Sequence, residues 1–353
     1  MKQLKVSIPG RDYTIYIEKG SIDYIGESVK NIYKGNKIAL VTDQNVYNLY
    51  GKKLELNLNK AGFNVHTTVL KPGEKSKSME TLIGLYDELL DFGISRSDLI
   101  IAFGGGVVGD LAGFAASTLL RGISFVQIPT SLLAQIDSSV GGKVAVNLEK
   151  GKNLVGSFYQ PIGVFIDPKL LKTLDPRYFS DGMGELIKYA CIKDENLFDK
   201  LSDYHDKEEL FEDIEEIIYR CLDIKRSIVE RDEMDRGERM LLNFGHTLGH
   251  GVEKYYNYEK YSHGEAVAIG MYNISKKSEQ AGLTENGTSD KIKNLLEKYS
   301  LPYEMPDVNK EDIKKVISVD KKVEGDYINI VVLEKIGKSF TKKIRREDIK
   351  DYI

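Results

Sequence analysis

The chain has 353 residues, of which 41% are hydrophobic and 29% charged, so at roughly 150 residues per domain it can hold about two domains whose cores need no disulfide. Its formal net charge of −4 at pH 7 disfavours nucleic acid as the main partner. No stretch approaches the ~20 apolar residues of a membrane span, and the first residues lack the apolar core of a signal peptide. The two cysteines form no C-x-x-C pattern. These features predict a cytoplasmic protein that acts on a small molecule.

The first half of the chain alternates strand-like and helix-like segments. The first residues alternate polar and apolar side chains in the manner of a strand, and 76–93 has helical periodicity with a serine start signal and a glycine stop. Apolar runs that end in turn residues lie at 37–43, 63–70, 98–106, 123–130 and 164–168. This order predicts an α/β domain with a Rossmann-like parallel sheet covered by helices.

The pattern changes near residue 174. Asp175 and Pro176 read as a helix cap followed by proline at the first helical position. From there to about Tyr299 nearly all segments are helix-like, and 326–340 resembles a strand pair. We therefore expect a nucleotide-binding domain over 1–174 and a mainly helical metal- and substrate-binding domain over 175–353.

A glycine loop of the form G-x-G-x-x-G occupies 104–109, between the strand LIIAF and a helix-like segment. In this context backbone amides at a helix start can bind a pyrophosphate, although an isolated match also fits a tight strand-to-helix turn. The loop follows a late strand, and the acid available for a ribose, Asp43, closes an earlier one. The sequence predicts nucleotide binding in a variant of the usual geometry.

Three of the five histidines fall within 18 residues of the second half. The spacings of Arg239, Asn243, His246 and His250 are 4, 3 and 4, which predicts that all four project from one face of a single helix. Such a face could be merely solvated, but the combination of arginine, asparagine and histidine favours a metal site. Spacing alone favours His246 and His250 as ligands, with Glu185 as the candidate carboxylate. HTLGH lacks the acid of H-E-x-x-H, which argues against a zincin protease.

Several basic residues lie beside glycine and serine in an otherwise acidic chain. Lys143 follows two glycines, Lys152 lies in GKN, and Arg121 precedes Gly122. Most lysines simply face solvent, but in glycine-rich loops ammonium and backbone groups can converge on an anion. This clustering indicates an anionic ligand.

Taken together, these motifs resemble the 3-dehydroquinate synthase family, and the resemblance runs through nearly the whole chain. Its signatures, in order, are PGEKSK (72–77), GGGVVGDLAGF (104–114), IPTSLLAQIDSSVGGKVAVN (128–147), GKN (151–153), DGMGELIK (181–188), RMLLNFGHTLGH (239–250) and DKK (320–322). Seven motifs in sequence are far more specific than one glycine loop.

The resemblance implies site residues, cofactors and partners. The implied metal ligands are Glu185, His246 and His263, with zinc or cobalt as the ion, so His250 becomes a substrate or proton-relay residue. The implied NAD contacts are Asp43, Glu74, Lys77, Gly105, Gly106, Val107, Asp110, Thr130, Ser131, Lys143, Lys152 and Thr173. The implied substrate-binding and catalytic residues are Arg121, Asp137, Lys143, Asn153, Lys188, Lys225, Arg239, Asn243, His250 and one of Lys321 or Lys322. Many members have two threonines where this chain has Thr130 and Ser131. The resemblance also suggests a homodimer.

The implied reaction converts 3-deoxy-D-arabino-heptulosonate 7-phosphate to 3-dehydroquinate and phosphate, in the shikimate pathway of aromatic amino-acid biosynthesis. It would run by transient NAD-dependent oxidation, phosphate β-elimination, reduction, ring opening and aldol closure. Three alternatives remain: a metal-dependent polyol dehydrogenase of related fold, a sister sugar-phosphate cyclase, and a non-catalytic nucleotide-binding module. The number of anion-binding residues argues against the first, Lys225 and Arg239 against the second, and the polar helix face against the third.

Overall fold

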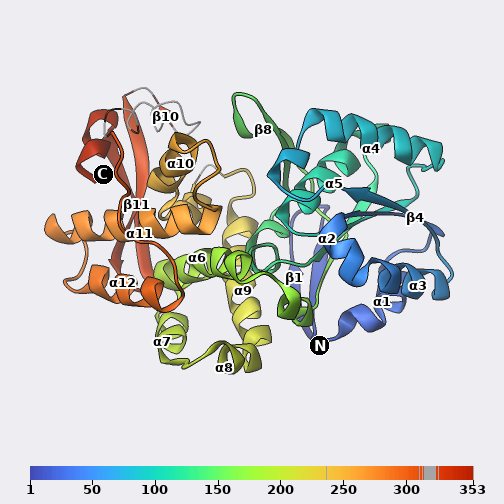
Figure 1. Ribbon diagram of the computed structural model, residues 1–353, viewed down its shortest axis with the longest axis horizontal. Coiled ribbons are helices and arrows are strands. Elements are labelled where there is room, and N and C mark those ends of the chain that lie inside the picture. Colours follow the sequence, from blue (N-terminus) through green and yellow to red (C-terminus); the bar gives the residue numbers. More distant parts are fainter. Residues whose placement is uncertain (236, 310, 312, 314–322, 325, 353) are drawn as a thin grey trace. The chain divides into compact units, whose positions relative to one another are not determined.

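The computed structural model describes the chain except for residues 236, 310, 312, 314–322, 325 and 353. The chain divides into two compact units, Met1–Leu174 and Asp175–Ile353 (Figure 1). Lys321 and Lys322, one of which is implied to bind the substrate, fall outside the described residues. Among the helices that the structure describes, none is both long and apolar enough to span a membrane.

The first unit is built on a seven-stranded sheet in the order β1-β2-β9-β6-β5-β3-β4. Its strands are β1 (Lys2–Val6), β2 (Tyr13–Ile17), β3 (Lys37–Asp43), β4 (Asn64–Leu70), β5 (Leu99–Gly104), β6 (Ser124–Pro129) and β9 (Gly163–Ile166). Only β1 pairs antiparallel; all other pairs in this sheet are parallel. The predicted Rossmann-like α/β fold is therefore confirmed for this unit.

Helices cover both faces of this sheet because the central strands are apolar on both sides. Ile38 and Leu40 of β3 join one core, with α1 (Ile25–Ile32) and α3 (Lys52–Lys60). Ala39 and Val41, which alternate with them, join the other core, with α4 (Met79–Asp91) and α5 (Gly106–Thr118). A separate hairpin, β7 (Lys143–Leu148) and β8 (Gly151–Phe158), packs on α5 through Val144 and Val146. Shorter helical turns are α2 (Gln44–Val46), η1 (Ser21–Asp23), η2 (Tyr47–Gly51), η3 (Glu74–Ser76), η4 (Leu119–Arg121), η5 (Ala134–Ser138) and η6 (Pro168–Thr173).

The strand order explains why the glycine loop comes late in the chain. The chain runs from β3 to β4 on one side of β3, and then returns to place β5 on the other side of β3. Thr42 pairs with Phe103, so Asp43 and Gly104 directly follow a matched pair on adjacent parallel strands. In open α/β sheets such a reversal of strand order is where ligands bind, beyond the carboxyl ends of the strands.

The second unit is mainly helical. Its helices are α6 (Pro176–Lys193), α7 (Glu195–Asp203), α8 (Lys207–Glu212), α9 (Ile214–Arg231), η7 (Glu238–Asn243), α10 (His246–Tyr255), α11 (His263–Gln280), α12 (Thr288–Lys298) and η8 (Arg346–Tyr352). Its antiparallel strands are β10 (Val323–Glu324), β11 (Tyr327–Lys335) and β12 (Lys338–Arg345), so a strand pair does form at the predicted tail. The Asp175 side chain accepts from the Arg177 backbone N–H and caps α6, with Pro176 at the first helical position.

One sequence-based prediction for this unit is wrong. Arg239, Asn243, His246 and His250 do not share the face of a single helix, because the chain leaves helical geometry between η7 and α10. Phe244 is extended and Gly245 has a φ of 80°. A side chain at Gly245 would place its Cβ 2.5 Å from the Val267 carbonyl oxygen, so α11 requires glycine here. The helical spacing of these four residues in the sequence therefore did not indicate one continuous helix.

Candidate functional site

A cluster of ionisable side chains lies inside the second unit, where α6, α10 and α11 meet. Glu185 comes from α6, His246 begins α10 and His263 begins α11. One ligand atom from each lies within 4.8 Å of the other two. Oε1 of Glu185 is 3.3 Å from Nε2 of His246 and 3.4 Å from Nε2 of His263. The structure thus brings together the three residues implied as metal ligands.

Glycines allow these helices to approach so closely. A Cβ added at Gly264 of α11 would lie 1.9 Å from the Asp181 carbonyl oxygen of α6. A Cβ at Gly270 would lie equally close to the Gly245 carbonyl oxygen at the start of α10. The Asp181 side chain also accepts a 2.5 Å hydrogen bond from the Gly264 backbone N–H. Close backbone contacts among α6, α10 and α11 therefore set the positions of the three side chains in the cluster.

The donor atoms suit a divalent metal. Both histidine Nδ1 atoms face groups that only accept hydrogen bonds: the Phe244 carbonyl oxygen at 3.1 Å from His246, and a Glu253 carboxylate oxygen at 3.2 Å from His263. Each Nδ1 therefore carries a proton, which directs the lone pair of a neutral ring to Nε2. Oε1 of Glu185 is buried and makes long contacts with the Nε2 atoms of His246 and His263, so all three candidate donor atoms face one another as at a cation site.

The three candidate metal ligands differ in how readily each side chain is protonated. Burial alone raises the pKa of Glu185, but the charge of Lys188 and the contact with His246 lower it well below its usual range. Burial lowers the pKa of His246 to about 4, so this ring is neutral at physiological pH. Burial also acts to lower the pKa of His263, but the attraction of Glu253 and the contacts with Glu185 raise it well above its usual value. A carboxylate and a neutral imidazole are thus preformed, whereas His263 must lose a proton to bind a cation.

Among its described residues, the second unit also buries three cationic side chains, one of which contacts this cluster. Lys188 of α6 is 1% exposed and its ammonium contacts the second carboxylate oxygen of Glu185. Lys225 of α9 and Arg239 of η7 are also buried. The Arg239 backbone N–H donates to Asp232, and its Nη1 donates to the Glu233 carbonyl oxygen at 2.6 Å. Charged groups are rarely buried without a functional or structural reason, so this unit has the character of an anion site.

His250 lies beside two of the three candidate ligands, whereas Asn243 precedes both of these in the sequence. The His250 ring centroid is 5.3 Å from that of His246 and 5.8 Å from that of His263. His250, Glu253 and His263 form a second group whose ligand atoms lie within 4.8 Å of one another. Asn243 ends η7 and is half-buried. Sequence reasoning missed Glu253, although its position seven residues after His246 and three after His250 places it on the same face of α10.

In the first unit, the predicted cofactor residues gather at the carboxyl edge of the sheet. Gly105 caps α5, and Gly106 and Val107 form its first turn. Thr130 donates its backbone N–H to the Gly104 carbonyl oxygen, and a Cβ at Gly105 would lie 3.4 Å from the Ser131 hydroxyl. The Asp43 carboxylate caps α2, accepting from the backbone N–H groups of Asn45 and Val46.

The remaining predicted cofactor residues surround this edge. The Thr173 hydroxyl is 2.8 Å from the Tyr50 hydroxyl of η2, the turn that follows α2. Lys152 lies on β8 and is half-buried. The first unit therefore presents backbone amides, hydroxyls and a carboxylate at the place where the strand order reverses.

Lys77 connects the glycine loop to the β7–β8 hairpin. This lysine is 4% exposed, and its ammonium lies 2.5 Å from the Asp110 carboxylate on α5 and also contacts the Asn153 side chain. Asn147 of β7 accepts from the Asn153 backbone N–H at 2.9 Å and donates to Glu74 at 2.7 Å. Asn147 was not predicted as a site residue. Its two side-chain bonds show that it positions Asn153 and Glu74.

Three predicted substrate-binding residues of the first unit lie on three different elements. Lys143 begins β7 and is exposed, and Asp137 lies in η5. Arg121 is exposed and ends η4, beyond the C-terminal end of α5. A 13-residue helix is about 20 Å long, so Arg121 lies far from Gly106 at the start of α5. The structure does not bring Arg121 to the glycine loop of its own unit.

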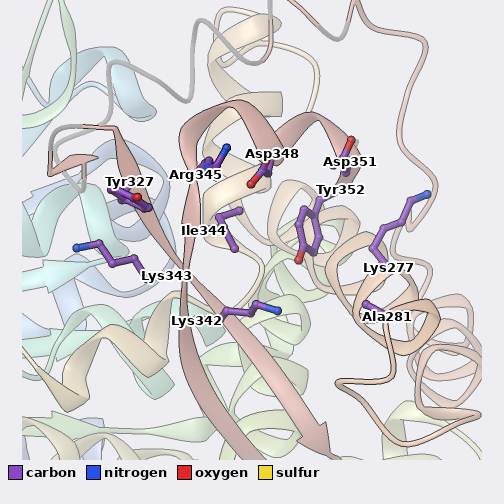
Figure 2. Close-up of a pocket in the computed structure, with 10 residues that line it drawn as sticks. All are labelled: Lys277, Ala281, Tyr327, Lys342, Lys343, Ile344, Arg345, Asp348, Asp351 and Tyr352. Atoms are coloured by element: carbon purple, nitrogen blue, oxygen red, sulfur yellow. The ribbon is translucent and has the colours of Figure 1, made fainter.

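A surface hollow elsewhere in the second unit is lined by α11, β11, β12 and η8 (Figure 2). Lys277, Lys342, Lys343 and Arg345 contribute positive charge, while Asp348 and Asp351 contribute negative charge. None of the predicted site residues lines this hollow. Its mixed charge favours no single ligand, so the candidate site remains the buried cluster.

Comparison with known proteins assigns the family. Residues 67–181 match the 3-dehydroquinate synthase N-terminal model and residues 182–323 match the C-terminal model. The chain is 53% identical over 353 residues to the 3-dehydroquinate synthase of Clostridium acetobutylicum, covering 100% of this chain and 99% of the relative.

Solved structures of related cyclases share the fold. A 2-deoxy-scyllo-inosose synthase complexed with carbaglucose-6-phosphate, NAD+ and Co2+ matches with a TM-score of 0.87, 26% identity, and coverage of 99% of this chain and 98% of that one. The 2-epi-5-epi-valiolone synthase of Streptomyces hygroscopicus subsp. jinggangensis 5008, with NAD+ and Zn2+ bound, matches with a TM-score of 0.88, 26% identity, and coverage of 96% and 95%. On the family models and the full-length relatives, the chain belongs to the 3-dehydroquinate synthase family.

Proposed function

We propose that this chain converts 3-deoxy-D-arabino-heptulosonate 7-phosphate to 3-dehydroquinate and phosphate, with NAD and one divalent metal ion, zinc or cobalt, as cofactors. The observation that carries the proposal is a three-residue candidate metal-ligand group in contact with the buried Lys188, in a chain of this family. When bound, the metal polarises substrate hydroxyl groups and NAD exchanges a hydride with the substrate carbon. The chain's own residues bind, orient and move protons.

Glu185, His246 and His263 would hold the metal. Three protein ligands leave a coordination position open, which is typical of catalytic rather than structural metal sites. The two protonated Nδ1 atoms and the buried Glu185 oxygen support this assignment. Lys188 fixes the other Glu185 oxygen, so the carboxylate presents a single oxygen to the ion.

Lys225 and Arg239 would bind the substrate carboxylate, while Lys143 and Asn153 would bind its phosphate. The bond from Nη1 to the Glu233 carbonyl oxygen fixes the guanidinium plane of Arg239. A fixed planar guanidinium suits a planar carboxylate better than an ammonium group does. Asn243, Asp137 and Lys188 complete the proposed substrate contacts, and His250 would contact substrate or relay a proton.

The first unit, 1–174, would bind NAD. The pyrophosphate would lie at the start of α5, where Gly105, Gly106 and Val107 present backbone amides. Asp43 would bind a ribose hydroxyl from the adjacent strand end. The other proposed NAD contacts are Glu74, Lys77, Asp110, Thr130, Ser131, Lys143, Lys152 and Thr173. The second unit, 175–353, would bind the metal and much of the substrate.

The same proposal includes a cytoplasmic homodimer. Cys191 and Cys221 are buried thiols rather than a disulfide, which suits a reducing compartment. Arg121 lies at the far end of α5 from the glycine loop, and the proposal assigns its substrate contact to a second copy of the chain. Mixing inactive Arg121→Ala and His263→Ala chains should then restore part of the activity. No recovery on mixing would contradict the exchange of Arg121 between copies.

Cofactor turnover separates a cyclase from a polyol dehydrogenase. Enzyme, zinc and a trace of NAD+ are mixed with a large excess of the heptulosonate phosphate. We expect phosphate release far above the NAD+ supplied, without build-up of NADH, and retention in the product of deuterium placed at C5. Accumulation of NADH one-for-one with substrate consumed would make the chain a dehydrogenase. Equal turnover of a sugar phosphate that lacks the carboxylate would favour a sister cyclase.

A further inference from the structure

Glu253 is a buried carboxylate next to the proposed metal ligands, but it is not one of the three. It is 2% exposed and lies on α10, two turns after His246. One of its carboxylate oxygens is 3.2 Å from Nδ1 of His263, while Nε2 of the same ring is 3.4 Å from Glu185. The His263 ring is therefore held between two carboxylates, one at each nitrogen.

His263 depends on such a contact more than His246 does. The His263 side chain is 32% exposed, whereas that of His246 is 11% exposed and its Nδ1 is held by a backbone carbonyl of its own segment. The His263 backbone is fixed separately, because Ser262 caps α11 through a capping box with Glu265 and Gly264 is bonded to Asp181. Backbone fixation leaves the χ angles of the imidazole open, and packing restrains this ring less than it restrains His246.

We propose that Glu253 is a positioning residue for the metal site, which selects the tautomer and orientation of His263. This inference rests on the proposed function, since it takes Glu185, His246 and His263 as the ligands. An ionised carboxylate only accepts hydrogen bonds, so Glu253 holds the proton on Nδ1 and leaves Nε2 to face the metal. Ligating histidines commonly donate their second ring N–H to a carboxylate in this way.

The position of Glu253 couples two helices at the site. His246 and Glu253 lie on α10, and His263 begins α11 after the connecting turn. The Glu253–His263 bond therefore links the two helices close to that turn. Gly249 permits close packing there, since its added Cβ would lie 2.9 Å from the Ala266 carbonyl oxygen. Glu253 therefore acts on the ligand that enters from the second helix, without contacting the metal.

Zinc affinity tests the proposal independently of catalysis. We expect Glu253→Gln to raise the zinc dissociation constant about 10-fold and Glu253→Ala up to about 100-fold, measured by competition with a chromophoric chelator. Glutamine keeps the size and an acceptor oxygen, so it guards against a failure to fold. The matched control is Glu259→Gln, which removes the same charge from an exposed position after α10 and should leave zinc affinity unchanged. NAD affinity should remain at the wild-type level in all three variants.

A double-mutant cycle separates positioning from general charge attraction. If Glu253 acts through His263, Glu253→Gln should have no further effect on zinc affinity in a His263→Ala chain. An equal effect in both backgrounds would mean that Glu253 attracts the ion by its charge alone, which overturns the proposal. The visible spectrum of the cobalt-loaded protein should also shift in Glu253→Gln, because the angle at the His263 ligand changes.

Two further outcomes are decisive. Unchanged zinc affinity in both Glu253 variants would refute the positioning role. Two zinc ions per wild-type chain and one in Glu253→Gln would make Glu253 a direct ligand together with His250, and would equally refute it. If His263→Ala itself binds zinc normally, the failure lies in the ligand set of the proposed function rather than in the role of Glu253.

Discussion

The candidate sites of the two units are constructed in different ways. In the first unit, backbone amides at the start of α5 and side chains at strand ends line the carboxyl edge of the sheet, and the buried cation Lys77 pairs with Asp110. In the second unit, charged side chains converge from separate helices: Glu185, Lys188 and Arg239 are each at most 2% exposed. Bound as proposed, a nucleotide would meet mostly backbone in the first unit, whereas an ion would meet side chains in the second.

This difference predicts where single substitutions have the larger effect. Backbone donors cannot be removed by changing one side chain, and several of them share one ligand. A buried carboxylate or imidazole has no substitute nearby, and its loss leaves its neighbours with uncompensated charge. We therefore expect sharp, specific losses in the second unit and smaller, more distributed losses in the first.

The largest effect should come from the histidines. His246→Ala or His263→Ala should weaken zinc binding so far that the purified chains contain little zinc, although a residual affinity can still be titrated at high zinc concentration, because a site with three protein ligands tolerates the loss of one poorly. His250→Ala should retain zinc and lose activity. Metal analysis of the purified variants measures this difference. A metal-free His250→Ala chain together with a fully loaded His263→Ala chain would contradict the proposed ligand set.

Arg239 should come next. Removing one side of a buried charge contact costs on the order of 2–5 kcal/mol, so Arg239→Ala should lower kcat/KM for the carboxylate-bearing substrate by roughly two orders of magnitude or more. NAD affinity should be unchanged. Arg345→Ala, which removes an arginine from an exposed position on β12 outside the proposed site, is the control and should retain nearly full activity. Wild-type kinetics in Arg239→Ala would exclude its role in binding the carboxylate.

In the first unit, the effect of removing a buried charge can be tested at Lys77. Lys77→Met keeps the length of the side chain but removes the ammonium that contacts Asp110 and Asn153. Loss of one partner of a largely buried pair should destabilise the chain by about 3 kcal/mol, measured by denaturant unfolding, and weaken NAD binding. Zinc affinity per folded chain should not change. The control is Lys75→Met, because Lys75 is an exposed lysine of the same turn. An equal loss of stability in both variants would show that the buried pair is not the cause.

The smallest effect concerns pH. The contacts of His263 with Glu253 and Glu185 raise its pKa, so the metal-free chain holds a proton that zinc must displace. Zinc affinity should increase with pH, by at most about tenfold per pH unit, until the pH exceeds the pKa of His263 in the folded chain. The raised pKa of His263 also affects folding stability. The ion pairs of protonated His263 stabilise the metal-free chain at low pH, and this stabilisation is lost as the pH rises through the pKa of His263 in the folded chain. Calorimetry in buffers of different ionisation enthalpy counts the proton released, and a count of zero would contradict the prediction.

Much of the fold could be predicted from local sequence. The predicted strand 37–43 is β3, and Asp175 does cap α6. The α/β class, the enzyme class and the family are confirmed by the family models, the curated relatives and the solved cyclases. NAD with zinc or cobalt also agrees with the ligands of the solved cyclases. The individual site residues and the dimer stay predictions.

The incorrect helix prediction has a physical cause. The helical spacing from Arg239 to His250 suggested one helix, but Gly245 breaks it because the carbonyl of Val267 leaves no room for a side chain. Helical periodicity records which residues could share a face, not whether another helix interrupts that face. Spacing alone also could not weigh His263 as a ligand, because His263 enters from a different helix.

The sequence by itself determined the order of strands and helices, the glycine loop and the family, because periodicity, caps and turn residues act over a few positions of the chain. Tertiary structure alone decided that Asp43 and Gly104 end adjacent strands, and that Nε2 of His263 faces Glu185 while Nδ1 faces Glu253. These relationships depend on strand order and on close approach of helices at glycines, both of which are set by packing between segments far apart in the chain.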